Sequence, residues 1–187
     1  MSQLGRTPYN ASKAGSDLAV RAYFETFKLP CTISNCSNNY VPYQFSEKVI
    51  PYFTVRLIDG NPMPIYRNSL NRREWLHVLD HCRAIDLILK NGRIGETYHV
   101  GSGLELDVEE IAGRLIRNFN LDESCKLYVP DRPGHDRRYL LDTDKIETEL
   151  GWHPEVDFET GFAETIAWYR QNETWWQPLM ECSPVNE

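Results

Sequence analysis

The sequence predicts an α/β protein with a parallel sheet, and three patterns support this fold class. Apolar residues recur at helical spacing through residues 8–27, and a short strand, CTISNC, follows directly at residues 31–36. Helical and strand-like segments keep alternating along the rest of the chain, as they do in parallel sheets with crossover helices. The 187 residues are enough for one substantial core or for parts of two domains.

The first helix has clear signals at both ends. Thr7 is a good N-cap, and Pro8 occupies the first turn, where its missing N–H is harmless. Pro30 ends the helical run before the strand at residues 31–36. The polar residues SNN, 37–39, predict a turn after that strand.

The following elements are separated by proline-rich joints. We expect a helix over much of residues 47–58, strands at 62–66 and 75–78, and a helix capped by Asp80 that ends at Asn91. Asp107 and Glu110 form a D-x-x-E capping box that opens another helix. The remaining expected elements are strands at 96–100 and 126–130, a helix ending at Gly151, a helix at 160–169, and a frayed tail after Pro178.

Composition excludes several classes of protein. The net charge of −7 opposes non-specific binding to nucleic acids and anionic membranes. No apolar run reaches the roughly 18 residues of a membrane span, and a polar stretch in place of a signal peptide follows Met1. The five cysteines are scattered without a C-x-x-C pair, which indicates buried free thiols in a reducing compartment. We therefore expect a cytoplasmic location.

Tyr9 and Lys13 form the first candidate site. Residues four apart lie on one helix face, and a lysine ammonium near a tyrosine hydroxyl favours the phenolate. Such a tyrosine can exchange a proton with a substrate hydroxyl while a nicotinamide takes or returns a hydride. The Y-x-x-x-K pattern alone is a weak signal, because a surface helix with a solvated lysine gives the same spacing.

Longer segments carry a more specific signal. TPYNASKAGSDLAVRAYFETF, SNCSNNYVPYQFSEKVIP, NRREWLHVLDH, ETYHVGSG and PDRPGHDRRYLLDTDKIETELGW follow in this order from about residue 6 to residue 179. Together they resemble the carboxyl-terminal half of the dTDP-glucose 4,6-dehydratase family, which belongs to the extended short-chain dehydrogenases/reductases. DRPGHDRRY is the most specific segment, since related epimerases and decarboxylases seldom carry it.

The resemblance implies a fold and a domain division. Residues 1–45 would be the last part of an NAD-binding Rossmann domain. Residues 46–179 would form mainly the smaller α/β nucleotide-sugar-binding domain, with some segments returning to the Rossmann sheet, and 180–187 a flexible tail. The helix that carries Tyr9 would contribute to a homodimer interface.

The resemblance also implies roles for individual residues. Tyr9 would be the acid/base at the sugar C4, Lys13 its partner and a ligand of the NAD ribose, and Asn39 a further NAD contact. The implied substrate contacts are Asn38, Lys48, Val49, Pro64, Ile65, Tyr66, Arg73, Arg132 and His135. Two arginines suit a diphosphate, because a guanidinium fork matches two phosphate oxygens. Arg72 is expected to be solvated.

Other features are assigned to structure. His77 and His81 straddle a strand-to-helix break, and no metal site is expected there. The five tryptophans are expected to anchor the core or an interface. Asp142 and Asp144 are expected to be carboxylates at a helix start.

Parts of the family pattern do not occur in these 187 residues. The glycine-rich G-x-x-G-x-x-G turn that binds the NAD pyrophosphate is missing, and so is the Asp-Glu pair that eliminates water. Val41 and Arg67 stand where, or near where, the family usually has glycine, so those turns must differ or be strained. Glu105 lies near a usual ligand asparagine, where a carboxylate would repel a diphosphate. The strand at 31–36 is expected to find its parallel neighbours in the missing half.

The resemblance implies a fragment of an enzyme that converts dTDP-glucose to dTDP-4-dehydro-6-deoxyglucose by C4 oxidation, water elimination and C6 reduction. The isolated chain is expected to be inactive. The alternatives are a non-catalytic dTDP-sugar-binding module, and a UDP-sugar epimerase or decarboxylase of the same superfamily.

Overall fold

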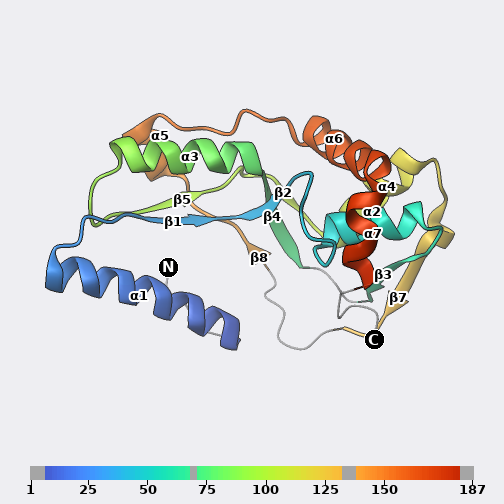
Figure 1. Cartoon of the computed structure of the whole chain (residues 1–187), viewed down its shortest axis with the longest axis horizontal. Coiled ribbons are helices and arrows are strands. Elements are labelled where there is room, and N and C mark those ends of the chain that lie inside the picture. The colour runs from blue at the N-terminus through green and yellow to red at the C-terminus, as the bar shows by residue number, and fades with distance from the viewer. Residues whose placement is uncertain (1–6, 68–70, 132–137, 182–187) are drawn as a thin grey trace.

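The computed structural model describes residues 7–67, 71–131 and 138–181, and it confirms the α/β class (Figure 1). The α-helices are α1 (Pro8–Phe27), α2 (Val49–Ile58), α3 (Val78–Asn91), α4 (Val108–Phe119), α5 (Asp144–Leu150), α6 (Phe158–Gln171) and α7 (Glu173–Glu181). The strands are β1 (Ile33–Cys36), β2 (Asn38–Tyr40), β3 (Met63–Tyr66), β4 (Arg72–His77), β5 (Thr97–Val100), β6 (Glu105–Leu106), β7 (Lys126–Val129) and β8 (Arg138–Tyr139).

Parallel pairing dominates among the described strands. β1 pairs with β5, β2 with β4, β3 with β7 and β8 with β4, all in parallel, while β6 pairs with β4 antiparallel. The strand at 31–36 was expected to find its parallel neighbours in the missing half, but β5 supplies one parallel neighbour within this chain. The turn expected at residues 37–39 was wrong, since Asn38 and Asn39 begin β2 immediately after β1.

Local capping signals were read correctly where the partners are close in sequence. Thr7 accepts a hydrogen bond from the backbone of Asn10 at the start of α1. Asp107 and Glu110 form the expected capping box of α4, with N···O distances of 2.8 and 2.9 Å. Asp142 accepts from the backbone N–H of Asp144, as expected for carboxylates at the start of α5.

Two helix predictions need correction. α3 begins at Val78, and its N-cap is His77, whose Nδ1 accepts from the backbone N–H of Leu79. Asp80 therefore lies inside the first turn and is not the cap. The frayed tail expected after Pro178 is also wrong as far as Glu181, because α7 continues through this proline to that residue.

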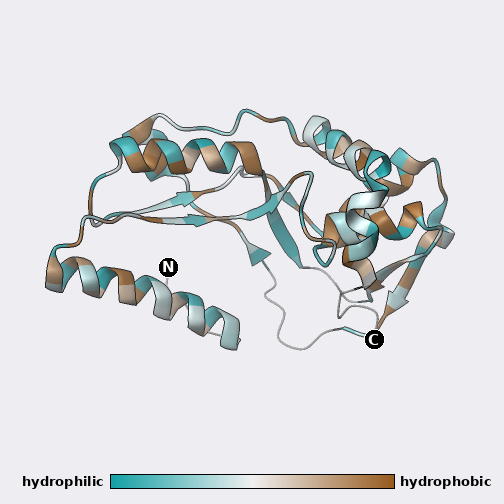
Figure 2. Cartoon of the chain, viewed as in Figure 1, coloured by the Kyte–Doolittle hydropathy of each residue, from teal (hydrophilic) through white to brown (hydrophobic). Residues whose placement is uncertain are grey.

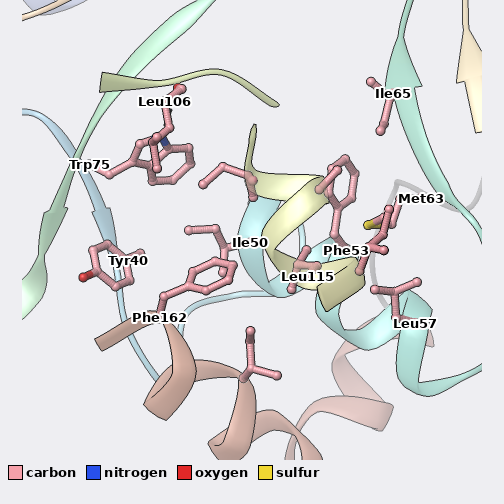
Figure 3. Packing of buried hydrophobic residues seen from close by; sticks show 14 of the residues in the cluster. Tyr40, Ile50, Phe53, Leu57, Met63, Ile65, Trp75, Leu106, Leu115 and Phe162 are labelled. Carbon is pink, nitrogen blue, oxygen red and sulfur yellow. Dashed lines mark hydrogen bonds between the residues drawn. The ribbon is translucent and has the colours of Figure 1, made fainter. Parts of the chain in front are cut away.

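The larger core cluster lies between α2, α4, α6 and the strands β2, β3 and β4 (Figure 3). Ile50, Ile65 and Leu115 are fully buried there, and Trp75 is nearly so. A second cluster joins α3, α5, β1 and β5, and contains Trp152. The third lies where α6 and α7 meet α2 and includes the buried Trp176.

The five tryptophans serve as anchors, as expected. Trp75, Trp152 and Trp176 are buried, and Trp168 and Trp175 pack against the cluster at α7. The thiols were predicted less well. Cys31, Cys36 and Cys125 are free and half-buried, whereas Cys82 is free and exposed.

Buried carboxylates tie distant segments to the centre of the fold. Glu74 in β4 is fully buried and accepts hydrogen bonds from the backbone N–H groups of Gly103 at 2.7 Å and Leu141 at 3.1 Å. A Cβ atom on Gly101 would lie 2.3 Å from a Glu74 carboxylate oxygen, so this position requires glycine for close approach. These contacts fix the loop after β5 against β4.

Val41 and Arg67, at or near positions where the family usually has glycine, do not adopt left-handed backbone. Neither Val41 nor Arg67 is among the described non-glycine residues of positive φ. Tyr43, two residues beyond Val41, has a φ of 66° instead, which is a costly conformation for this residue. Of the two expected outcomes, a different turn or strain, the positive φ in this loop falls on Tyr43 and not on Val41.

Helix α1 buries none of its residues among the described elements. It runs back below β1 and β5 in Figure 1, and Figure 2 shows apolar residues recurring along it. Leu18, Tyr23 and Phe27 remain 67%, 57% and 71% exposed. This confirms that its apolar positions are left uncovered. No helix in the described part of the chain combines the length and apolar character needed to cross a membrane.

Candidate functional site

Tyr9 and Lys13 share one face at the start of α1, as their spacing predicted. The Lys13 Nζ atom lies 5.6 Å from the centroid of the Tyr9 ring. Tyr9 is 66% exposed. The Thr7 cap and Pro8 fix where this helix begins, and therefore where the pair stands.

Polar contacts place the start of α1 near the carboxyl end of β1. Asn35 donates to Asp17 at 3.2 Å, and Arg21 donates to the Thr97 hydroxyl at 2.8 Å. α1 therefore runs antiparallel to β1, with its amino-terminal turns toward Cys36. Parallel sheets bind ligands at this end of their strands.

The electrostatics of Cys36 connect the helix with the strand end. Burial raises the pKa of the Cys36 thiol above its usual value, against the hydrogen bond from Asn39 and the positive charge of Lys13. Lys13 and the Asn39 side chain thus both influence the Cys36 thiol at the end of β1.

Asn38 and Asn39 lie on β2, where successive side chains point to opposite faces. Asn38 is exposed, and Asn39 is half-buried. The Asn39 amide donates to the Ser37 carbonyl at 2.9 Å and lies 3.0 Å from His81 Nδ1 through its oxygen. Sequence reasoning assigned His81 to structure alone and missed this contact, because the two residues are 42 positions apart.

The predicted substrate residues are spread over α2, β3 and β4. Lys48 is the N-cap of α2 and pairs with Glu47 at 2.7 Å, and Val49 is the first residue of the helix. In β3, Pro64 and Tyr66 are half-buried, whereas the side chain of Ile65 is fully buried. At position 65, therefore, the backbone and not the side chain can contact a ligand.

The two arginines of β4 make different contacts. Arg73 is half-buried, and its guanidinium donates to the Arg72 carbonyl at 2.9 Å. Arg72, which was expected to be solvated, donates to the Glu105 carbonyl at 2.7 Å and pairs with Glu110 at 3.3 Å. That expectation was wrong. Arg132 and His135 lie outside the described residues.

Glu105 is neutralised in a way that sequence did not predict. Both nitrogens of the Arg138 fork reach its carboxylate, at 2.8 and 2.6 Å. This bidentate bond lowers the pKa of Glu105 below its usual value. The expected repulsion of a diphosphate is therefore reduced by the neighbouring guanidinium.

Two hollows of the described surface lie away from all of these residues. One of about 300 Å³ is lined by residues 120–122, 124 and 125, and one of about 260 Å³ lies between α4 and α6. Neither contains the chemistry expected of the site. The candidate site is instead an open surface formed by the start of α1 and the end of β1.

Comparisons with known proteins show which family this chain resembles. A profile of the family described as GDP-mannose 4,6 dehydratase matches residues 2–165. The dTDP-glucose 4,6-dehydratase of Streptomyces niveus is 51% identical over 172 residues, which are 92% of this chain and 51% of that protein. That of Streptomyces antibioticus is 49% identical and covers 92% of this chain and 52% of its own length.

Solved structures give the same result. The dTDP-glucose 4,6-dehydratase of Streptomyces venezuelae, solved with NAD and TYD bound, matches with a TM-score of 0.91 and 52% identity over 93% of this chain and 54% of that one. The Bacillus anthracis enzyme in complex with NAD matches with a TM-score of 0.88 and 43% identity over 92% of this chain and 55% of that one. A UDP-glucose 4-epimerase from Thermotoga maritima is only 26% identical, with a TM-score of 0.83 over 89% of this chain and 54% of that one.

The chain spans about half the length of the curated relatives it matches. Its predicted resemblance to dTDP-glucose 4,6-dehydratases is confirmed, both in sequence and in fold. Because the family profile covers most of its residues, this chain belongs to the GDP-mannose 4,6 dehydratase family.

Proposed function

We propose that this chain is the part of a dTDP-glucose 4,6-dehydratase that contributes the C4 acid/base and much of the nucleotide-sugar pocket. The observation that carries the proposal is the 51% identity to a dTDP-glucose 4,6-dehydratase along 92% of the chain. The parent reaction would convert dTDP-glucose to dTDP-4-dehydro-6-deoxyglucose. A UDP-sugar epimerase or decarboxylase is the weaker candidate, because the epimerase relative is only 26% identical.

Tyr9 and Lys13 would perform the proton chemistry. Tyr9 would act as its phenolate, which the Lys13 ammonium on the same helix face would stabilise. The phenolate oxygen would take the proton of the sugar C4 hydroxyl. NAD, when bound, supplies the acceptor for the C4 hydride. The proton would thus leave the C4 hydroxyl oxygen, and the hydride would leave the C4 carbon.

The described residues fit one end of NAD. Lys13 offers N–H donors to ribose hydroxyls. Asn39 hydrogen-bonds the half-buried Cys36 thiol, whose pKa the Lys13 charge also lowers. The glycine-rich turn for the pyrophosphate does not occur in the sequence. We therefore assign only the nicotinamide–ribose end to Tyr9, Lys13 and Asn39.

The nucleotide-sugar would lie across β2, α2, β3 and β4. Asn38 is exposed on the β2 face opposite to Asn39, which suits a pair of residues that contact different ligands. Lys48, Val49, Pro64, the Ile65 backbone and Tyr66 would line the sugar and the base. Arg73, with Arg132 and His135, would bind the diphosphate, because an acidic chain needs local cations for a dianion.

The division of the chain follows from the same proposal. Residues 1–45 would belong to the Rossmann domain, 46–179 mainly to the nucleotide-sugar domain, and 180–187 to a tail. The uncovered α1 would pack in a homodimer in the cytoplasm. The chain alone would be inactive, because it carries neither the elimination pair nor the pyrophosphate turn.

Calorimetric titration with dTDP, UDP and GDP tests the substrate class. We expect saturable heat that favours dTDP, and Arg73→Ala to weaken binding by roughly 10- to 100-fold, the usual effect of losing a charged hydrogen bond. Arg117→Ala, an exposed change on α4, is the matched control and should leave the affinity unchanged. A preference for UDP would favour the epimerase class, and turnover of dTDP-glucose by the pure chain would contradict its predicted inactivity.

No heat from any of the three nucleotides, with the protein still folded, would refute nucleotide binding by this chain. Equal losses in the Arg73 and Arg117 variants would refute the assignment of Arg73 to the diphosphate.

A further inference from the structure

The side-chain amide of Asn39 is surrounded by hydrogen-bond partners that leave it little freedom. Its Nδ2 lies 2.9 Å from the Ser37 carbonyl oxygen and 3.4 Å from the Cys36 sulfur. Its Oδ1 lies 3.0 Å from Nδ1 of His81. Three partners from two separate segments thus contact one amide.

The Ser37 carbonyl decides which way the amide points. A carbonyl oxygen only accepts hydrogen bonds, so the amide group that faces it must be the NH₂. Ser37 is itself held in place, because its backbone N–H donates to the Val100 carbonyl at 3.0 Å and extends the β1–β5 ladder. The reversed amide would bring two carbonyl oxygens together.

The orientation of Asn39 then fixes the state of His81. With Oδ1 toward the imidazole, Nδ1 must carry a hydrogen and donate it. Burial lowers the pKa of His81, which keeps the ring neutral near pH 7. The neutral ring is therefore the Nδ1–H tautomer, with its lone pair on Nε2.

This network limits what Asn39 can offer to a ligand. Both amide hydrogens are directed at protein atoms, and one lone pair of Oδ1 is used by His81. The second Oδ1 lone pair remains. Asn39 can then accept a hydrogen bond from a ligand without giving up any protein contact.

We propose that His81 is a positioning residue that, together with the Ser37 carbonyl, locks the Asn39 amide so that it presents only an acceptor. The complementary ligand group is a hydrogen-bond donor, such as a hydroxyl or a carboxamide NH₂. The identification of this ligand as the nicotinamide–ribose end of NAD rests on the proposed function.

The first experiment measures the His81 tautomer by ¹⁵N NMR of the ligand-free chain at neutral pH. We expect Nδ1 to carry the hydrogen, and the exposed His153 serves as the reference ring. Asn39→Ala should release His81 from this tautomer. The Nε2–H tautomer in the unmodified protein would overturn the proposal, and this measurement needs no variant to fold.

Variants of His81 separate positioning from packing. In His81→Asn the side-chain NH₂ occupies the place of Nδ1–H, whereas His81→Leu removes the donor at similar size. In the unmodified chain and in His81→Asn, we expect the Asn39 side-chain amide hydrogens to exchange with solvent about tenfold slower than those of the exposed Asn61. In His81→Leu we expect this protection to be lost. Equal protection in the two variants would overturn the role of His81.

Titration of NAD into the labelled chain tests the ligand separately. Shifts of the Asn39 amide signals in the unmodified chain and in His81→Asn, weakened in His81→Leu, would support both proposals. If NAD shifts no signal while the tautomer and the exchange rates are as expected, the NAD assignment fails and the locked amide stands. If NAD shifts the Asn39 signals equally in all three proteins, the positioning role of His81 fails.

Discussion

Replacing Asp80 by alanine should remove a bond that holds two remote parts of the chain together. Asp80 is 1% exposed in the first turn of α3. Its Oδ1 accepts from the backbone N–H of Glu155 at 3.0 Å, and its Oδ2 accepts from that of Val156 at 3.1 Å. Arg83 also pairs with Oδ1. The carboxylate thus fixes the segment that leads into α6.

The cost of Asp80→Ala follows from these contacts. Each backbone N–H that loses its acceptor in this half-buried segment costs about 1–2 kcal/mol. Arg83 keeps a second partner in Glu155 at 3.2 Å, so the loss of the Arg83–Asp80 ion pair adds little to the cost. The free energy of unfolding should fall by about 2–4 kcal/mol in total.

Urea unfolding followed by tryptophan fluorescence is a direct assay, because the Trp152 indole donates to the Asp80 carbonyl at 3.2 Å. Asp86→Ala is the matched control on the same helix, since its exposed pair with Lys90 contributes only about 0.3–0.5 kcal/mol. Amide exchange of Glu155 and Val156 should accelerate in Asp80→Ala alone. Losses of equal size in the two variants, with unchanged exchange, would refute this reasoning.

Three further predictions concern the helices. Gly161→Ala should destabilise the protein by about 1–3 kcal/mol, because its Cβ would lie 2.9 Å from the Tyr40 hydroxyl. Gly113→Ala should stabilise the protein by about 0.5–1 kcal/mol, because the nearest atom to its Cβ would be 3.7 Å away. The urea midpoints of the two variants check this difference, and equal midpoints would contradict the packing argument. Asp107→Ala breaks the capping box of α4 and should lower the free energy of unfolding by about 1 kcal/mol. An unchanged urea midpoint would contradict this prediction. Burial lowers the pKa of His77 and His81 in the folded protein. The unfolded chain, in which histidine has a pKa of about 6.5, therefore binds more protons as the pH falls, so the free energy of unfolding should decrease between about pH 7 and pH 5. A urea midpoint that does not move over this range would contradict the expected direction.

Short-range signals were sufficient for much of the fold. The capping box of α4 and the proline at the start of α1 use partners within a few residues, so sequence identifies them. Asp80 has the residue type of an N-cap but accepts hydrogen bonds from residues more than 70 positions away. No local rule distinguishes these two uses of an aspartate.

Packing over long distances explains the other differences. α7 contains Pro178, a residue that weakens an isolated helix, but the buried Trp176 anchors it against α6 and α2. β8 is only two residues long and exists because β4 offers it an edge. Among the site residues, the Tyr9–Lys13 face was predictable from spacing alone, whereas the contact between Asn39 and His81 depends on how β2 and α3 pack.

The parallel pairings also set the order in which the protein can form during synthesis. Ile33 pairs with Thr97, Met63 with Lys126, and Arg72 with Arg138, so the paired residues are 63 to 66 positions apart in the chain. At about 5–20 residues per second, a ribosome needs roughly 3–13 s to cover that interval. During this time β1 and β3 lack the strand that each pairs with, whereas β4 can already pair with β2. The early helices α2 and α3, whose turns close locally, contact β3 and both β1 and β4 respectively, so they can pack on these strands before the later strands emerge.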